Sequence, residues 1–186
     1  MASSRASSTA SAPPTTGPIR RRLAWTMTRV PRASPSRSRS RRMVEESMNV
    51  FTYGSLMFPV VWERVLPGGR RRSGRAVLGG YRRRRIRGEV YPALVPGSPE
   101  DAVEGVLYRG VTSDQLEALD RFEDEGTGYQ RIEVTVRDLA GIPYPAWVYR
   151  YLGDARVEAA DWDPVEFERD GLARFLATYC RARDPG

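Results

Sequence analysis

A short β-strand that stops abruptly at a glycine is the most constraining feature of this sequence. It lies in the segment from Asn49 to Phe58. Val50 and Thr52 fall on one face of an extended chain, whereas Phe51 and Tyr53 fall on the other. Both sides of this strand can therefore be covered by the rest of the fold.

The strand pattern ends at Gly54, and a loop follows. A glycine lets the backbone turn sharply and lets a ligand approach without a Cβ in the way. Ser55 adds a hydroxyl group next to backbone N–H groups that have no partner once the strand has ended. The loop formed by Tyr53, Gly54, Ser55, Leu56, Met57 and Phe58 could hold an anion or a developing oxyanion, although by itself Tyr-Gly-Ser-Leu also fits a simple tight turn.

The first 47 residues differ in composition from the remainder. They contain ten arginines and only two acids, whereas residues 48–186 contain twenty arginines and twenty-one acids, so the net charge of +7 belongs entirely to this segment. Ser, Pro and Arg dominate, and large apolar residues are too few to offset the entropy of ordering. The sequence predicts a disordered tail over residues 1–47 and one domain over residues 48–182.

Three interpretations of the tail remain open. An Arg/Ser-rich arm could bind nucleic acid, and a Ser- and Arg-rich, acid-poor segment could be a transit peptide. We favour the third interpretation, in which Met43 or Met48 is the true start of the protein.

Short strands and three helices alternate through the domain. Helices are expected over 59–66, 112–122 and 163–179, and the sheet is expected to include 50–53, 76–78, 81–95, 103–109, 129–137 and 146–151. Thr112 and Gln115 have capping-box spacing, and so have Asp163 and Glu166. About six strands with one antiparallel hairpin predict an α+β fold, a small closed mixed β-barrel with flanking helices.

Missing residue types exclude several kinds of active site. The chain has no histidine and no lysine, and its one cysteine is Cys180. Ser-His-Asp and Cys-His sites, His-ligated zinc, Schiff-base chemistry and a Gly-Lys-Ser/Thr phosphate loop are therefore excluded. No apolar run approaches the roughly 18 residues of a membrane span, so we expect a cytoplasmic protein without a membrane partner. Carboxylates and tyrosines remain for proton transfer near neutral pH.

Two clusters of charge interrupt the apolar pattern. Arg82–Arg85 cannot all face a core, so they form a solvated strand edge or pair with nearby acids, and one of them could contact a substrate carboxylate. The second cluster lies at the C-terminus of the predicted helix 112–122 and consists of Glu117, Asp120, Glu123, Asp124 and Glu125. The helix dipole, the neighbouring acids and apolar Phe122 all raise the pKa of a carboxyl there. Such a glutamate could be a general base, or the acids could be a solvated helix end.

An ordered set of motifs resembles the gamma-glutamylcyclotransferase-like proteins, within them the branch of AIG2-like proteins and gamma-glutamylamine cyclotransferases. The motifs are Phe51–Leu56, Gly88–Leu94, Glu104–Tyr108, Leu119–Glu123, Tyr129–Arg131 and Trp147–Tyr149. They span residues 48 to about 180 and include none of the tail. One departure is that Asp124 and Glu125 follow Glu123, where relatives often have a glycine.

The resemblance implies that Glu123 is the catalytic general acid/base and that the loop Tyr53–Phe58 receives the substrate. It also implies that Tyr91, Tyr129 and Arg131 contribute to substrate binding. The implied reaction converts a gamma-glutamyl amide or peptide into 5-oxoproline, without metal or cofactor. A gamma-glutamyl binding module without turnover is the main alternative, and binding of nucleic acid is a weaker one. The sequence makes no prediction of the oligomeric state.

Overall fold

The computed structural model describes residues 47–68 and 72–180. All described residues belong to one compact unit within Met43–Gly186. The disordered tail predicted for residues 1–47 lies, up to residue 46, outside the described residues.

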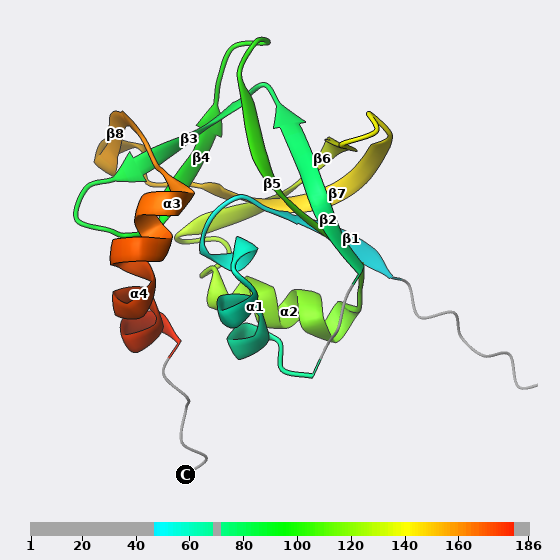
Figure 1. The fold of residues 1–186 in the computed structure, drawn as a ribbon, viewed down its shortest axis with the longest axis horizontal. Helices are drawn as coiled ribbons and strands as arrows, with labels where there is room; N and C mark the ends of the chain where they lie inside the picture. The colour runs from blue at the N-terminus through cyan, green and yellow to red at the C-terminus, as the bar shows by residue number, and fades with distance from the viewer. Residues whose placement is uncertain (1–46, 69–71, 181–186) are drawn as a thin grey trace, which may run out of the picture. The chain divides into compact units, whose positions relative to one another are not determined.

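Five strands form a closed barrel (Figure 1). In barrel order they are β1 (Met48–Thr52), β5 (Ala102–Val111), β2 (Arg72–Gly79), β6 (Tyr129–Asp138) and β7 (Pro143–Tyr151). β1 pairs in parallel with β7 and closes the ring, while the other neighbours pair antiparallel. The prediction of a small closed mixed barrel is confirmed, with five barrel strands in place of about six.

The remaining strands form a separate three-stranded sheet in the order β4 (Pro92–Pro96), β3 (Tyr81–Ile86) and β8 (Val157–Asp161). The sequence pattern did not predict β8, whose last three residues are exposed and which pairs with β3 only at Arg84 and Ile86. Three of the four arginines of β3 pair with acids: Arg82 lies 2.7 Å from Asp101, Arg84 lies 2.6 Å from Asp161, and Arg85 pairs with Glu166.

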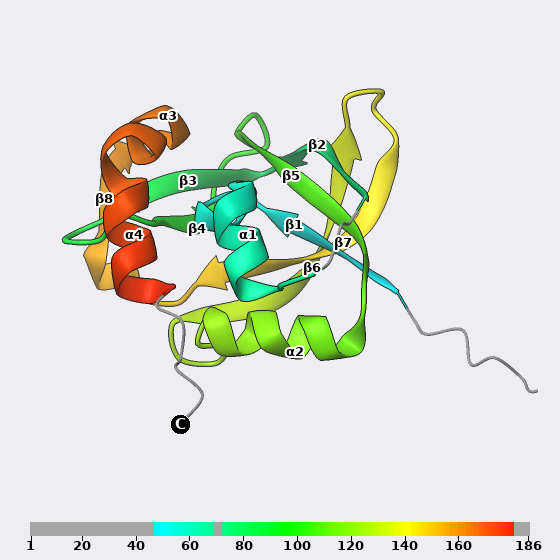
Figure 2. The same ribbon diagram turned by 60° about the horizontal axis from the view of Figure 1, so that its bottom comes forward.

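The helices lie around one side of the barrel (Figures 1 and 2). They are η1 (Ser55–Met57), α1 (Pro59–Val65), α2 (Ser113–Phe122), η2 (Asp154–Arg156), α3 (Pro164–Glu166), the π-helical turn η3 (Phe167–Gly171) and α4 (Leu172–Tyr179). The helix predicted over 163–179 is therefore interrupted by a π-helical turn.

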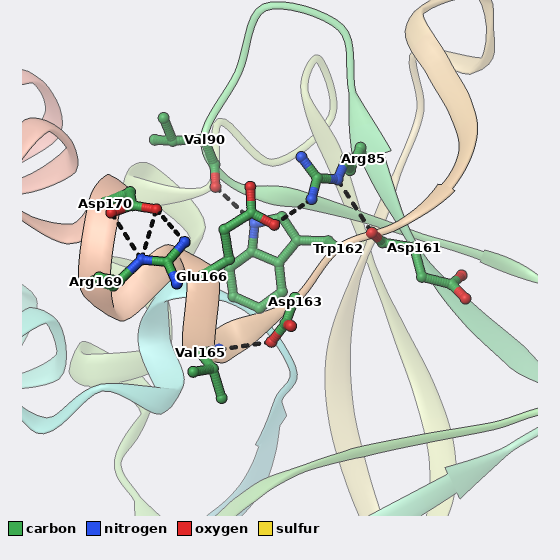
Figure 3. Close-up of polar contacts among 9 residues, drawn as sticks. All are labelled: Arg85, Val90, Asp161, Trp162, Asp163, Val165, Glu166, Arg169 and Asp170. Atoms are coloured by element: carbon green, nitrogen blue, oxygen red, sulfur yellow. Dashed lines mark hydrogen bonds and ion pairs between the residues drawn. The ribbon is translucent and has the colours of Figure 1, made fainter.

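The predicted helix caps are confirmed in part. Thr112 and Gln115 form the capping box of α2. Asp163 caps α3 by accepting a hydrogen bond of 2.8 Å from the Val165 N–H. Glu166, however, does not complete a second capping box, because its carboxylate pairs with Arg85 of β3 instead (Figure 3).

The strand β1 is covered on both sides, as its pattern predicts. Val50 belongs to the core between the barrel and the helices, whereas Phe51 and Tyr53 belong to the core inside the barrel. Gly105 of β5 permits this packing, because a Cβ there would lie 2.2 Å from the Thr52 carbonyl oxygen and 2.6 Å from the Phe51 ring. Within the described part of the chain, none of the helices has the length and apolar character that crossing a membrane requires.

Candidate active site

The loop after β1 is held against β4. The chain bends at Gly54, where φ is −123° and ψ is −139°. The glycine also permits close approach, since a Cβ there would lie 2.9 Å from Cγ of Pro92. Ser55 and Leu56 then begin η1, and the first N–H groups of a helix have no partner within it.

A cleft of about 1550 Å³ adjoins this loop. Its lining includes Tyr53, Gly54, Ser55 and Leu56 from the loop, together with Tyr91, Glu123 and Tyr129. Three other residues predicted from the sequence do not line it: Met57, Phe58 and Arg131. The ring of Phe58 packs against Phe167 at 5.1 Å, and Met57 lies beneath Arg83.

Glu123 occupies the C-cap position of α2, where its backbone N–H donates to the Leu119 carbonyl. Within the described residues, its carboxylate accepts no hydrogen bond and forms no ion pair. The residue keeps some exposed surface, yet its carboxyl lies in the cleft, where desolvation and, secondly, the charge of Asp124 raise its pKa to about 8. A carboxyl with this pKa can both accept and donate a proton near neutral pH.

Asp120, one turn earlier on α2, is fully engaged. Its two carboxylate oxygens accept hydrogen bonds from the Tyr149 hydroxyl at 2.6 Å and from Arg131 at 2.7 Å. Arg131 in turn lies over the Trp147 ring, 5.0 Å from its centre. Arg131 therefore connects α2 to the barrel strand β6, and it does not line the cleft.

Three tyrosines surround Glu123. Burial, as the main cause, raises the pKa values of Tyr53, Tyr129 and Tyr149, and the nearby Glu123 charge contributes in each case. Their hydroxyls thus stay protonated and donate: Tyr53 to the Tyr149 carbonyl at 2.7 Å, and Tyr129 to the Pro92 carbonyl at 2.9 Å. Sequence reasoning did not single out Tyr149 as a site residue, because its contact with Asp120 joins two distant segments.

Arg83 supports the loop from the other side. Its guanidinium donates a hydrogen bond of 2.9 Å to the Tyr53 carbonyl and lies 5.1 Å from the centre of the Trp162 ring. Burial lowers its pKa from the usual value. Arg83 does not line the cleft, and the other three arginines of β3 pair with acids. Arg82–Arg85 therefore stabilise the fold and do not line the cleft.

The link after Glu123 begins with a residue in the left-handed conformation. Asp124 has φ +47°, a left-handed conformation that favours glycine, and it is the only such non-glycine residue within the described ranges. The link then closes on itself, since the Gly126 N–H donates to the Tyr129 carbonyl at 2.8 Å. Asp124 is thus held beside Glu123 in the conformation that a glycine would adopt.

Comparison with known proteins identifies relatives of the chain. Residues 50–164 match the family model described as "Gamma-glutamyl cyclotransferase, AIG2-like". "AIG2-like protein A" of Arabidopsis thaliana is 34% identical over 133 residues, which cover 70% of this chain and 78% of that protein.

Solved structures have the same fold. A solution structure from Arabidopsis thaliana has a TM-score of 0.54 and 30% identity, covering 72% of this chain and 88% of that chain. A structure titled "Gamma-glutamyl cyclotransferase" has a TM-score of 0.53 and covers 76% of this chain and 90% of that chain; at 22% identity it is similar in fold alone.

Proposed function

This chain belongs to the AIG2-like gamma-glutamyl cyclotransferase family, and from that premise we propose that it converts a gamma-glutamyl amide or peptide into 5-oxoproline and a free amine or amino acid. The observation that carries the proposal is the position of Glu123. Its unpaired carboxyl, with a pKa of about 8, lies in the same cleft as the backbone of Gly54, Ser55 and Leu56.

The reaction is an intramolecular acyl transfer. The substrate's α-amine attacks its own γ-carbonyl carbon, forming the ring C–N bond, and the bond from that carbon to the leaving nitrogen then breaks. Because both reacting groups belong to one molecule, the cleft needs only to hold a folded conformer. A substrate with one ammonium and one carboxylate gives 5-oxoproline carboxylate and a protonated amine, so charge and protons balance.

Glu123 moves the proton in this scheme. Its carboxylate takes a proton from the α-ammonium, which frees the nitrogen lone pair for attack, and then donates a proton to the leaving nitrogen. The pKa of an α-amino group at a peptide terminus is roughly 7.7–8.0, and the substrate's adjacent α-carboxylate raises that of its ammonium. The pKa of Glu123 is about 8, so its carboxylate can take this proton and return one to the leaving nitrogen near neutral pH.

The loop supplies the second contribution. Negative charge develops on the γ-carbonyl oxygen when the amine attacks, and backbone N–H donors fixed in advance stabilise it. The N–H groups of Gly54, Ser55 and Leu56 take this role in the proposal. The hydrogen bond of 2.9 Å from Arg83 to the Tyr53 carbonyl fixes the peptide just before them.

The test is release of 5-oxoproline from a panel of gamma-glutamyl amines, gamma-glutamyl dipeptides and glutathione. Glu123→Gln keeps the shape of the side chain but removes the base, so turnover should fall by about 100- to 10,000-fold. Asp120→Asn and Asp124→Asn are the matched controls and should cost much less. Activity that persists in Glu123→Gln while a neighbouring acid proves essential would refute the residue assignment. Binding of gamma-glutamyl compounds without any 5-oxoproline would establish a binding module instead.

A further inference from the structure

Four aromatic side chains form a continuous surface on one side of the cleft: Tyr91, Phe122, Phe175 and Tyr179, here called the aromatic wall. Tyr91 meets Tyr179 edge to face at 5.4 Å between ring centres and Phe175 at 6.2 Å. Phe122 meets Phe175 in the same manner at 6.3 Å. Edge-to-face arrangements of this kind are favourable and fix the orientation of each ring.

Half of the aromatic wall lies outside the region that defines the family match. Phe175 and Tyr179 belong to α4, which begins at Leu172, whereas the family match ends at residue 164. The loop Tyr53–Leu56 and Glu123 lie inside the match. The residues assigned to the chemistry therefore lie inside the match, whereas half of the aromatic wall comes from a helix beyond its end.

The aromatic wall is held in place by polar contacts behind it. Glu89 accepts hydrogen bonds from Arg156 at 2.7 Å and from the Tyr179 hydroxyl at 2.8 Å. The Trp162 indole N–H donates to the Val90 carbonyl at 2.6 Å (Figure 3). These contacts fix the segment that carries Tyr91 against the segment that leads into α4. The rings are thus positioned before any ligand arrives.

The rings remain accessible although they are fixed. Tyr91 and Phe122 are partly exposed and Tyr179 is 44% exposed, so only Phe175 is a core residue. Arg156 lines the cleft near Tyr91 and is paired with Glu89. Arg156 is therefore not free to bind a carboxylate of a ligand that lies against the aromatic wall.

Phe122 directly precedes Glu123, so the aromatic wall begins next to the group that would protonate the leaving nitrogen. The γ-carbonyl oxygen is assigned to the loop Tyr53–Leu56, and the leaving group then extends past Glu123. We propose, on the basis of the function above, that the aromatic wall is the leaving-group subsite and that the preferred substrate is a gamma-glutamyl amide of an aralkyl amine. An aromatic ring of the substrate would join the edge-to-face cluster of Tyr91 and Tyr179.

The experiment compares three gamma-glutamyl amides that differ only in the amine: benzylamide, cyclohexylmethylamide and methylamide. The benzylamide should have a kcat/KM about tenfold or more above that of the methylamide, since burying a few carbons of a leaving group changes rates by at least this factor. The benzylamide should also exceed the cyclohexylmethylamide. Equal values for benzylamide and methylamide overturn the proposal, and a cyclohexylmethylamide equal to the benzylamide overturns its aromatic part.

Variants at Tyr179 test whether the aromatic wall causes the preference for the benzylamide. Tyr179→Leu removes the ring but keeps an apolar side chain, and it should reduce the ratio of benzylamide to methylamide kcat/KM several-fold. Tyr179→Phe removes only the hydroxyl that binds Glu89 and should keep the ratio. An unchanged ratio in Tyr179→Leu overturns the assignment of the wall.

Binding separates this proposal from the proposed function. Dissociation constants of the same three amides are measured by calorimetry on the Glu123→Gln variant, in which the aromatic wall is intact. If no amide releases 5-oxoproline from the wild-type protein, the proposed function fails. Tighter binding of the benzylamide then still supports the subsite, whereas equal dissociation constants overturn it.

Discussion

The raised pKa of Glu123 has a consequence for stability that does not depend on catalysis. Its pKa rises from an ordinary value of 4.5 to about 8, chiefly by desolvation. The folded protein therefore holds the proton more tightly than the unfolded chain does. As the pH increases from 4.5 to 8, the folded state must either keep the proton or place a charge in the cleft, and its stability decreases. The loss stops above pH 8, where both states are ionised.

The variant Glu123→Gln should escape this loss, because a neutral amide resembles the protonated acid. Each pKa unit corresponds to 1.36 kcal/mol, so relative to the wild type its free energy of unfolding should rise by about 3 kcal/mol between pH 4 and pH 7, and by about 5 kcal/mol between pH 4 and pH 9. A constant offset from the substitution itself cancels in this comparison.

Urea denaturation of both proteins at several pH values measures the effect. Glu125→Gln is the matched control, because it makes the same chemical change at an exposed glutamate of the same link. If the difference between Glu123→Gln and the wild type were flat from pH 4 to pH 9, the carboxyl would not be desolvated in the folded protein, and the argument for a poised base would fail.

Three further substitutions test the site. Asp124→Asn removes the charge that raises the pKa of Glu123, and asparagine tolerates the left-handed backbone at this position. The acid limb of the kcat/KM profile, where activity rises with pH, should therefore move to lower pH. An unmoved limb would contradict the electrostatic coupling between Asp124 and Glu123. Gly54→Ala places a Cβ 2.9 Å from Pro92, so turnover should fall and denaturant midpoints should show a loss of about 1–3 kcal/mol; wild-type values of both would refute the close contact. Asp120→Asn weakens the hydrogen bond from Arg131 of β6, so the free energy of unfolding should fall by about 1 kcal/mol while turnover changes little. A large loss of kcat would instead assign Asp120 a chemical role.

The parts of the fold that could be predicted from the sequence are those determined by neighbouring residues. The alternation from Val50 to Tyr53 indicates a strand covered on both sides, and Thr112 with Gln115 marks the start of α2. The acids at the end of α2 also form a local signal of a general base, and the family resemblance then indicated Glu123 among them. Helix caps and strand faces of this kind depend on spacings of a few residues.

Contacts between distant segments could not be predicted in this way. Tyr179 and Glu89, which fix the aromatic wall, lie 90 positions apart, and Tyr149 lies 29 positions from Asp120. The strand β8 was missed because its last three residues are exposed, and it forms only where β3 offers a partner. Likewise Glu166 has the correct spacing for a capping box, but Arg85 on another element takes its carboxylate.

Asp120 and Glu123 illustrate how the barrel assigns different roles to two acids of one helix. They lie three positions apart on α2, so sequence alone treats them as equivalent neighbours on one face. β6 and β7 then supply Arg131 and Tyr149, which donate hydrogen bonds to both oxygens of Asp120 and hold it in place. Glu123 is at the C-cap of α2, and within the described residues its carboxylate has no hydrogen bond or ion pair; it lines the cleft with Asp124 as a like-charged neighbour. Two acids three positions apart thus differ in their partners, and the unpaired one is the candidate acid–base group of the proposed function.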